Sequence, residues 1–106
     1  MSKIDFEYIR YQVQIGNYEI SIHAFERMRR RGITLDDMEN AIINGDIIER
    51  DSGAEPFPKC IFWGFTLIKG ESIHVVCSIT PQSRVVTVYF PEEDQWSHGR
   101  FRRRRK

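Results

Sequence analysis

The sequence predicts an α+β fold, with N-terminal helices packed on one face of a mainly antiparallel sheet of three to four strands. Apolar residues recur every three or four positions up to residue 45, which is typical of amphipathic helices. From residue 46 they alternate or run together, and Gly- and Pro-containing turns separate the runs, as in a β-meander. The chain has 106 residues, of which 41% are hydrophobic. We therefore interpret 1–96 as one domain and 97–106 as a flexible basic tail.

The first helix is expected within residues 3–16, where Gly16 and Asn17 supply a C-terminal stop. Its apolar stripe, at spacings of four, three and four, consists of Ile4, Tyr8, Tyr11 and Ile15. Apolar residues also alternate from residue 9, so a strand remains the alternative there. Residues 18–22 are expected to form a short extended segment that leads into the next helix.

The central helix is expected between Ser21, as N-cap, and Gly32, as a left-handed C-cap. On a helical projection, Ala24, Phe25 and Met28 fall on one side. The titratable side chains gather on the other side, and they are His23, Glu26, Arg27, Arg30 and Arg31. An imidazole, a carboxylate and guanidiniums beside a helix N-terminus could bind a phosphate. The alternative is an ordinary solvated helix face.

The third helix is expected to begin after Thr34, as N-cap, and to end at Asn44 and Gly45. Asp36 and Asp37 lie in its first turn, where the helix dipole favours negative charge. Its apolar stripe consists of Leu35, Met38, Ala41 and Ile42. We interpret this helix as core packing alone.

Four strands are expected, over Asp46–Arg50, Lys59–Ile68, Ile73–Thr80 and Arg84–Phe90. In the last hairpin we expect three cross-strand pairs, Ile79–Arg84, Val76–Thr87 and His74–Tyr89. Its apolar face is expected to consist of Ile73, Val75, Cys77, Ile79, Val86, Val88 and Phe90. The opposite face is expected to carry His74, Val76, Ser78, Thr80, Val85, Thr87 and Tyr89. A bulge would change these faces. Residues 92–99 show no pattern.

Composition excludes several classes of protein. No apolar run approaches the ~20 residues that span a bilayer, so no membrane contact is expected. The N-terminus has no secretion signal, and two cysteines are too few for a disulfide framework, so we expect a cytoplasmic protein. Metal-ligand spacing is absent around His23, His74 and His98, so we expect no metal and no cofactor.

Positive charge is concentrated in two places. Residues 97–106 hold six of the 16 Lys and Arg residues and no acid, which leaves 10 bases against 15 acids elsewhere. Four of those 10 bases lie within Arg27–Arg31. Local basic clusters on an acidic body favour the binding of a polyanion such as RNA.

Because no metal or cofactor is expected, the chemistry that remains for this chain is metal-free acid–base catalysis. RNA cleavage by the 2′-OH needs a base, an acid for the 5′-oxygen, and cations for the phosphate. The catalytic candidates are His23, Glu26, Arg27, Arg31, Thr87 and Tyr89. The RNA-binding candidates are Arg30, His74, Arg102, Arg103, Arg104 and Arg105. Because Thr87 and Tyr89 point away from the apolar face, convergence requires the central helix to begin at a sheet edge, or a different face assignment.

The run Ile20–Met28, followed by Arg31-Gly32-Ile33-Thr34, resembles the S-x-H-A-x-x-R-M-x-x-R-x-I-[ST] signature of a bacterial domain-of-unknown-function family, number 4258. Residues 43–49 and 86–89 also match its pattern. The family is similar to RelE- and MqsR-like toxins of the barnase-like nuclease group. The resemblance implies a RelE-like α+β fold, ribonuclease activity and a zinc-finger, helix-turn-helix antitoxin as partner. It maps polar site residues onto His23, Arg27, Arg31, Thr87 and Tyr89.

Three interpretations follow. The first is a metal-independent endoribonuclease toxin of a toxin–antitoxin pair. The second is a non-catalytic module that binds RNA or protein through the Arg-rich helix face and the basic tail. The third is a structural role in which Arg27 and Arg31 pair internally with carboxylates.

Overall fold

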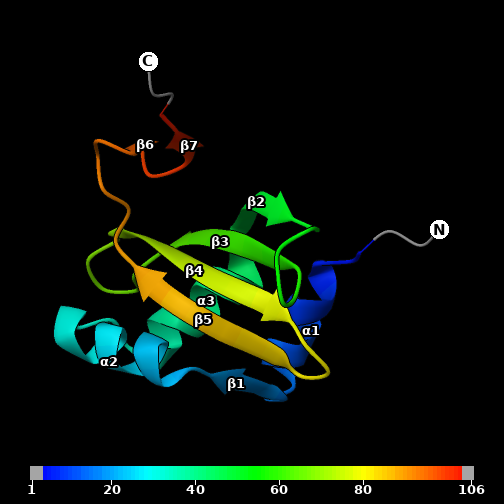
Figure 1. Cartoon of the computed structure of the whole chain (residues 1–106). Coiled ribbons are helices and arrows are strands. Elements are labelled where there is room, and N and C mark those ends of the chain that lie inside the picture. Colours follow the sequence, from blue (N-terminus) through cyan, green and yellow to red (C-terminus); the bar gives the residue numbers. More distant parts are fainter. Residues whose placement is uncertain (1–3, 104–106) are drawn as a thin grey trace.

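A computed structural model of the chain, which describes residues 4–103, confirms the α+β class (Figure 1). Its elements in chain order are α1 (Glu7–Gln14), β1 (Tyr18–Ile20), α2 (Ile22–Arg31), α3 (Leu35–Asn44), β2 (Asp46–Asp51), β3 (Lys59–Phe65), β4 (Ser72–Ile79), β5 (Ser83–Tyr89), β6 (Trp96–Ser97) and β7 (Phe101–Arg102). The described strands form a five-stranded sheet in the order β1-β5-β4-β3-β2 and a two-stranded ribbon of β6 and β7.

The sheet has one strand more than the three to four expected, because the short segment before α2 joins it. Strand β1 pairs in parallel with β5, with Tyr18 opposite Ser83 and Ile20 opposite Val85, whereas the other neighbours are antiparallel. Three residues give too little alternation to identify a strand from sequence, and a parallel partner lies far along the chain. This pairing brings the start of α2 to the edge of the sheet (Figure 1).

The core lies between the sheet and helices α1 and α3, which cover one of its faces (Figure 1). The expected stripe of α1 is wrong, because its members Ile4, Tyr8, Tyr11 and Ile15 are exposed. Ile9 and Val13 are buried instead, together with Phe6. The two sets have the same helical spacing and differ only in phase, so local periodicity cannot choose between them.

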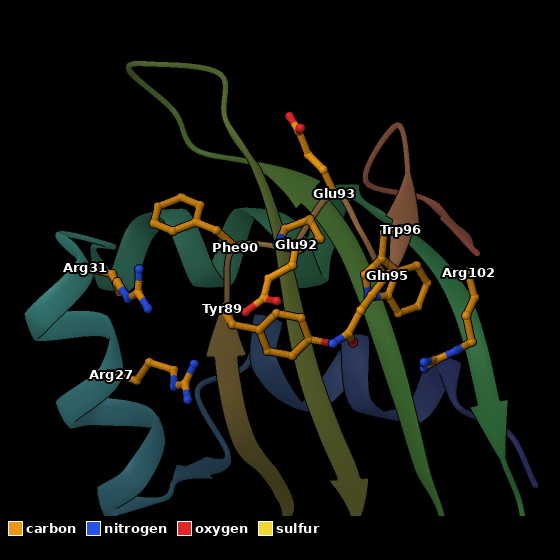
Figure 2. Close-up of a pocket in the computed structure, with 10 residues that line it drawn as sticks. Arg27, Arg31, Tyr89, Phe90, Glu92, Glu93, Gln95, Trp96 and Arg102 are labelled. Atoms are coloured by element: carbon orange, nitrogen blue, oxygen red, sulfur yellow. The ribbon is translucent and has the colours of Figure 1, made fainter. Parts of the chain in front are cut away.

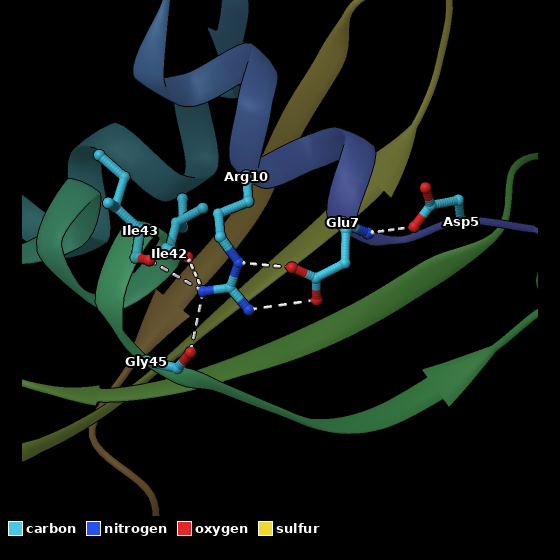
Figure 3. Close-up of polar contacts among 6 residues, drawn as sticks. All are labelled: Asp5, Glu7, Arg10, Ile42, Ile43 and Gly45. Carbon is cyan, nitrogen blue, oxygen red and sulfur yellow. Dashed lines mark hydrogen bonds and ion pairs between the residues drawn. The ribbon is translucent and has the colours of Figure 1, made fainter.

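Helix α3 is fastened at both ends. Thr34 and Asp37 form a reciprocal capping box at its N-terminus, with hydrogen bonds of 2.9 Å in each direction. At the other end, Nη1 of Arg10 donates to the carbonyl oxygens of Ile42 and Gly45 at 2.6 and 2.9 Å (Figure 3). A cation at a helix C-terminus is favourable for the helix dipole. These contacts hold α1 against α3.

The expected core face of α3 is confirmed for Met38, Ala41 and Ile42, which are fully buried, but Leu35 is 49% exposed. The helix lies close to β3 at Gly64, where an added Cβ would come within 2.7 Å of Ala41. Glycine at this position is therefore required by the packing of α3 on the sheet.

Helix α2 begins and ends where the sequence predicts. The Ser21 hydroxyl accepts from the Ala24 amide at 3.0 Å, and Gly32 adopts φ +70° as the C-cap. Ala24 and Met28 are buried as expected, whereas Phe25 is 57% exposed. Among the described elements, β5 is the main neighbour of α2, at the sheet edge, so fewer side chains of the helix are covered than expected.

The β4–β5 hairpin follows the expected register at its open end, where Val76 faces Thr87 and His74 faces Tyr89. Near the turn the expected pair Ile79–Arg84 is wrong, because Ile79 faces Ser83. A bulge between Val76 and Cys77 absorbs the difference. Beyond the bulge the face alternation changes, so Val85 is buried in the core and Val86 is only half-buried.

The C-terminal segment differs from the tail expected at 97–106. Residues 96–97 and 101–102 form the β6–β7 ribbon, in which Trp96 pairs with Arg102. Two ion pairs link it to β2, Arg100–Asp46 at 2.7 Å and Arg102–Glu49 at 2.9 Å. A two-residue strand held by distant acids leaves no periodic signal in the sequence.

Candidate functional site: an arginine-lined cleft

A cleft of about 570 Å³ lies between α2, the end of β5 and the β6–β7 ribbon (Figure 2). Three parts of the chain line it, α2, the segment after β5, and the ribbon, and the lining residues are Arg27, Arg31, Tyr89, Phe90, Pro91, Glu92, Glu93, Gln95, Trp96 and Arg102. The sequence-predicted residues Arg27, Arg31, Tyr89 and Arg102 therefore share one open site.

Arg27 and Arg31 form the α2 wall of the cleft. They are four residues apart on one helix face, and Figure 2 shows both guanidinium groups directed from α2 toward the cleft. Nε of Arg27 is buried and has no hydrogen-bond partner among residues 4–103, and neither arginine forms an ion pair with a carboxylate of that part of the chain. A buried guanidinium nitrogen without a partner is costly, and an anion in the cleft could supply one.

The start of α2 is tied to β5 and fixes this wall. The Ser21 amide donates to the Val85 carbonyl at 2.9 Å, and the Ser21 hydroxyl donates to the Val86 carbonyl at 2.7 Å. From this anchor α2 runs along the edge of β5, toward Tyr89 (Figure 1). Because α2 begins at the sheet edge, its arginines can lie on the same side of the sheet as Tyr89. The condition for convergence of these side chains is therefore met.

Tyr89 lies across the cleft, between the α2 arginines and the ribbon (Figure 2). Its hydroxyl lies 3.2 Å from Nδ1 of His74, and Nε2 of His74 lies 2.5 Å from the carbonyl oxygen of Gly99. Burial raises the pKa of the Tyr89 hydroxyl and lowers the pKa of the His74 imidazole. Both groups are thus neutral near pH 7.

The ribbon forms the remaining wall. The Arg102 guanidinium pairs with both carboxylate oxygens of Glu49 at 2.9 Å and lies 4.5 Å from the centre of the Trp96 ring. Trp96 in turn packs edge-on against His74, with 4.4 Å between ring centres. Glu92 and Glu93 also line the cleft, so its charge is mixed and the arginines on α2 carry its positive side.

The other catalytic candidates lie outside the cleft lining. His23 and Glu26 are exposed, and His23 lies one helical turn before Arg27 on the same face of α2. Thr87 is half-buried and lies two residues before Tyr89, on the same face of β5. The structure thus brings Arg27, Arg31 and Tyr89 together and places His23 and Thr87 beside them along the α2–β5 edge.

The RNA-binding candidates divide in a different way. Arg30 is exposed on α2 and does not line the cleft, whereas Arg102 does. Arg103 lines a neighbouring hollow of about 550 Å³ and donates from Nε to the Glu93 carbonyl. Arg104 and Arg105 lie outside the described residues.

The assignment of His74 to RNA contact needs correction. Its side chain is 0% exposed, and both ring nitrogens have partners within the fold. The expectation came from its place on the outer face of β4, which the ribbon covers. His74 therefore contacts the Tyr89 hydroxyl from inside the fold and has no exposed surface for RNA.

Sequence reasoning missed the segment between β5 and the ribbon, including Glu92, Gln95 and Trp96. One signal was available. Trp96 is a large aromatic residue in a polar stretch, and it is 4% exposed here. An aromatic side chain of that size usually anchors the segment that carries it.

Residues 4–103 contain no helix long and apolar enough to cross a membrane. The same residues contain no group of three or more His, Cys, Asp or Glu side chains placed to hold a metal ion.

Comparisons with known proteins bear on the family alone. Neither the curated proteins nor the solved structures gave a match. A family model described as Domain of unknown function (DUF4258) matches residues 20–90, from the end of β1 to the end of β5. The match includes Arg27, Arg31 and Tyr89 and ends before the ribbon. Since it covers more than half of the sequence, this chain belongs to the DUF4258 family.

Proposed function

We propose that this chain is a metal-independent endoribonuclease, and that it binds the RNA phosphate between α2 and Tyr89. One observation carries the proposal. Arg27 and Arg31 line an open cleft without a carboxylate partner among the described residues, although acids are common in the chain. Guanidinium groups in this state bind phosphate through charge-assisted hydrogen bonds.

The proposed reaction uses the chain's own side chains. The 2′-OH attacks the adjacent phosphorus, its proton goes to a base, the bond to the 5′-oxygen breaks, and an acid protonates that oxygen. Arg27 and Arg31 stabilise the charge that develops on the phosphate oxygens. His23 is the proposed proton carrier, because it is the titratable imidazole on the same face of α2, one turn from Arg27. Thr87 lies nearby and can donate a hydrogen bond.

A second candidate is a non-catalytic module that binds RNA through the same cleft. One observation favours it. His23 and Glu26, the acid–base candidates of α2, do not line the cleft, so bound phosphate could lie beyond their reach. This candidate predicts RNA binding that weakens with salt and yields no cleavage products.

The proposed biological setting is a toxin–antitoxin pair of the RelE and MqsR kind. It rests on the sequence resemblance of the α2 motif, which also suggests a zinc-finger, helix-turn-helix antitoxin as partner. An antitoxin that blocks the cleft would protect RNA in proportion to its concentration. Co-purification of the protein with the product of the adjacent gene tests the partnership directly.

The function is tested by incubating the purified protein with end-labelled RNA in EDTA. The variant His23→Ala is compared with Ile22→Ala, which removes an exposed, uncharged side chain of the same helix outside the cleft lining. We expect cleavage by the wild type, at least a 100-fold loss in His23→Ala, and unchanged cleavage in Ile22→Ala. Intact RNA with wild type, bound in a salt-dependent manner, favours the non-catalytic module. Intact RNA without binding contradicts both candidates.

A further inference from the structure

Two hydrogen bonds, between Tyr89 and His74 and between His74 and Gly99, have a direction that can be deduced. The Gly99 carbonyl can only accept, so Nε2 of His74, 2.5 Å away, must carry the ring hydrogen. His74 is fully buried, and burial disfavours its charged form, so the ring has one hydrogen. Nδ1 is then an acceptor, and the only hydrogen available to the 3.2 Å contact is that of the Tyr89 hydroxyl.

The direction of this bond decides what Tyr89 offers to a ligand. With its hydrogen donated inward to His74, the Tyr89 oxygen has only lone pairs left for the cleft. It can accept a hydrogen bond from a ligand, but it has no hydrogen to donate to a phosphate oxygen. Arg102 and Arg27 both lie close enough to favour ionisation of Tyr89, yet burial outweighs them, so the hydroxyl keeps its hydrogen.

A ribose 2′-OH is the hydrogen-bond donor that distinguishes RNA from DNA. We infer that His74 is a positioning residue for ribose recognition, which holds the Tyr89 hydrogen inside the fold and leaves the Tyr89 oxygen to accept from a 2′-OH in the cleft. This inference rests on the proposed RNA-binding function. It makes ribonucleic acid, and not any polyanion, the preferred ligand of the arginine-lined cleft.

The β6–β7 ribbon also holds His74 in the orientation that accepts the Tyr89 hydrogen. Gly99 supplies the carbonyl that fixes the His74 tautomer, and Trp96 covers the ring edge-on. The ribbon is held by Arg100 and Arg102 through their acids on β2. The family match ends at residue 90, before the ribbon. The ribbon, outside the matched segment, therefore determines that Tyr89, inside it, accepts rather than donates a hydrogen bond in the cleft.

The test compares two fluorescent oligonucleotides of identical length and base, oligouridylate and oligodeoxyuridylate, by fluorescence anisotropy at 4 °C, with His23→Ala present in every protein so that the ribo form is not cleaved; wild type in this test means this parent. They differ only in the 2′-OH, and a gel run afterwards checks that the RNA is intact. We expect wild type to bind the ribo form about five-fold more tightly, the effect of one hydrogen bond. Tyr89→Phe should bind both forms equally, at the wild-type affinity for the deoxy form.

His74→Leu removes the acceptor for Tyr89 and should also lose the preference, whereas His74→Asn can still accept through its amide oxygen and should retain it. Tyr11→Phe is the matched control, since Tyr11 is an exposed tyrosine of α1 outside the cleft lining. Circular dichroism checks folding. If His74→Leu does not fold, His74→Gln takes its place, because its longer side chain moves the amide acceptor away from the Tyr89 hydroxyl, and it too should lose the preference.

The outcomes separate the two claims. Equal binding of both oligonucleotides by wild type, or an unchanged ribose preference in Tyr89→Phe or in folded His74→Leu, overturns the inference and leaves phosphate binding by the arginines intact. Binding of neither oligonucleotide overturns the proposed function and the inference with it.

Discussion

Arg27 of α2 and Tyr89 of β5 line the same cleft, although they lie at opposite ends of the family-matched segment. Their approach depends on Ser21, whose side chain caps α2 and donates to the Val86 carbonyl. One residue thus sets both where α2 begins and where it lies against β5. The position of the arginines relative to Tyr89 follows from this anchor.

Ser21→Ala is therefore expected to lower both stability and RNA affinity. Loss of an N-cap costs about 1 kcal/mol, and the unpaired Val86 carbonyl adds to that cost. We expect the free energy of unfolding in urea to fall by about 1–2 kcal/mol. RNA affinity should fall several-fold, because the first turn of α2 is no longer held against β5.

The matched control is Thr34→Ala, which removes the N-cap of α3, a helix outside the cleft lining. It should reduce stability by about 1 kcal/mol and leave RNA affinity unchanged in conditions where both variants are folded. Equal effects of the two variants on RNA binding would contradict the role of Ser21 in placing the arginines.

Gly99→Ala is expected to displace the ribbon. Gly99 has φ +73°, and an added Cβ would lie 2.8 Å from Oγ of Ser72 and 3.3 Å from Nε1 of Trp63. The left-handed backbone alone costs about 1–2 kcal/mol for a residue other than glycine, and the contacts add strain. Amide hydrogen exchange should show faster exchange in the ribbon and loss of protection around His74.

Gly70→Ala supplies the comparison, because Gly70 has φ +65° and nothing within 4 Å of an added Cβ. It should show the backbone cost without any change in exchange within the ribbon. Unchanged ribbon exchange in Gly99→Ala would mean that the ribbon accommodates the added methyl group without moving, which would contradict this prediction.

His74 should make the fold sensitive to mild acid. Burial lowers its pKa in the folded protein below the ordinary value of about 6.5. As pH falls through about 6.5, His74 gains a proton in the unfolded chain but not in the folded one. The unfolded state then binds more protons, so the free energy of unfolding decreases until pH passes the lower, folded pKa.

Urea unfolding at pH 7.5, 6.5 and 5.5 measures this effect. The comparison is with His74→Asn, which has no titrating ring at that position. The wild type should lose more stability than the variant between pH 6.5 and 5.5, and a smaller excess between 7.5 and 6.5, where the unfolded imidazole only begins to gain its proton. Parallel profiles over the whole range would show that His74 does not titrate as its burial requires.

The part of the site that depends on neighbouring residues could be predicted from the sequence. Ser21 and Gly32 specify α2 through capping and a left-handed turn, which depend only on neighbouring residues. The spacing of Arg27 and Arg31 then places both on one helix face. For this reason the α2 wall of the cleft could be derived from the sequence.

The rest depends on contacts between distant residues. Val85 and Val86 are adjacent and equally apolar, so only the bulge on the hairpin decides which one is buried. The ribbon is held by Arg100 and Arg102 pairing with acids on β2, and a basic run gives no indication of such partners. His74 was misassigned for the same reason, since the ribbon that covers it could not be foreseen.

The measurement that tests the account most directly is the salt dependence of single-stranded RNA binding by wild type, Arg27→Ala/Arg31→Ala, and Arg29→Ala. Arg29 is an exposed arginine of the same helix outside the cleft lining, so Arg29→Ala measures what the loss of one positive charge from α2 does by itself. We expect the double variant to lose at least ten-fold in affinity and its salt slope to fall by about two, one for each phosphate contact. Arg29→Ala should remain close to wild type. A double variant that binds RNA as well as Arg29→Ala, with the same salt slope, would contradict the assignment of this cleft.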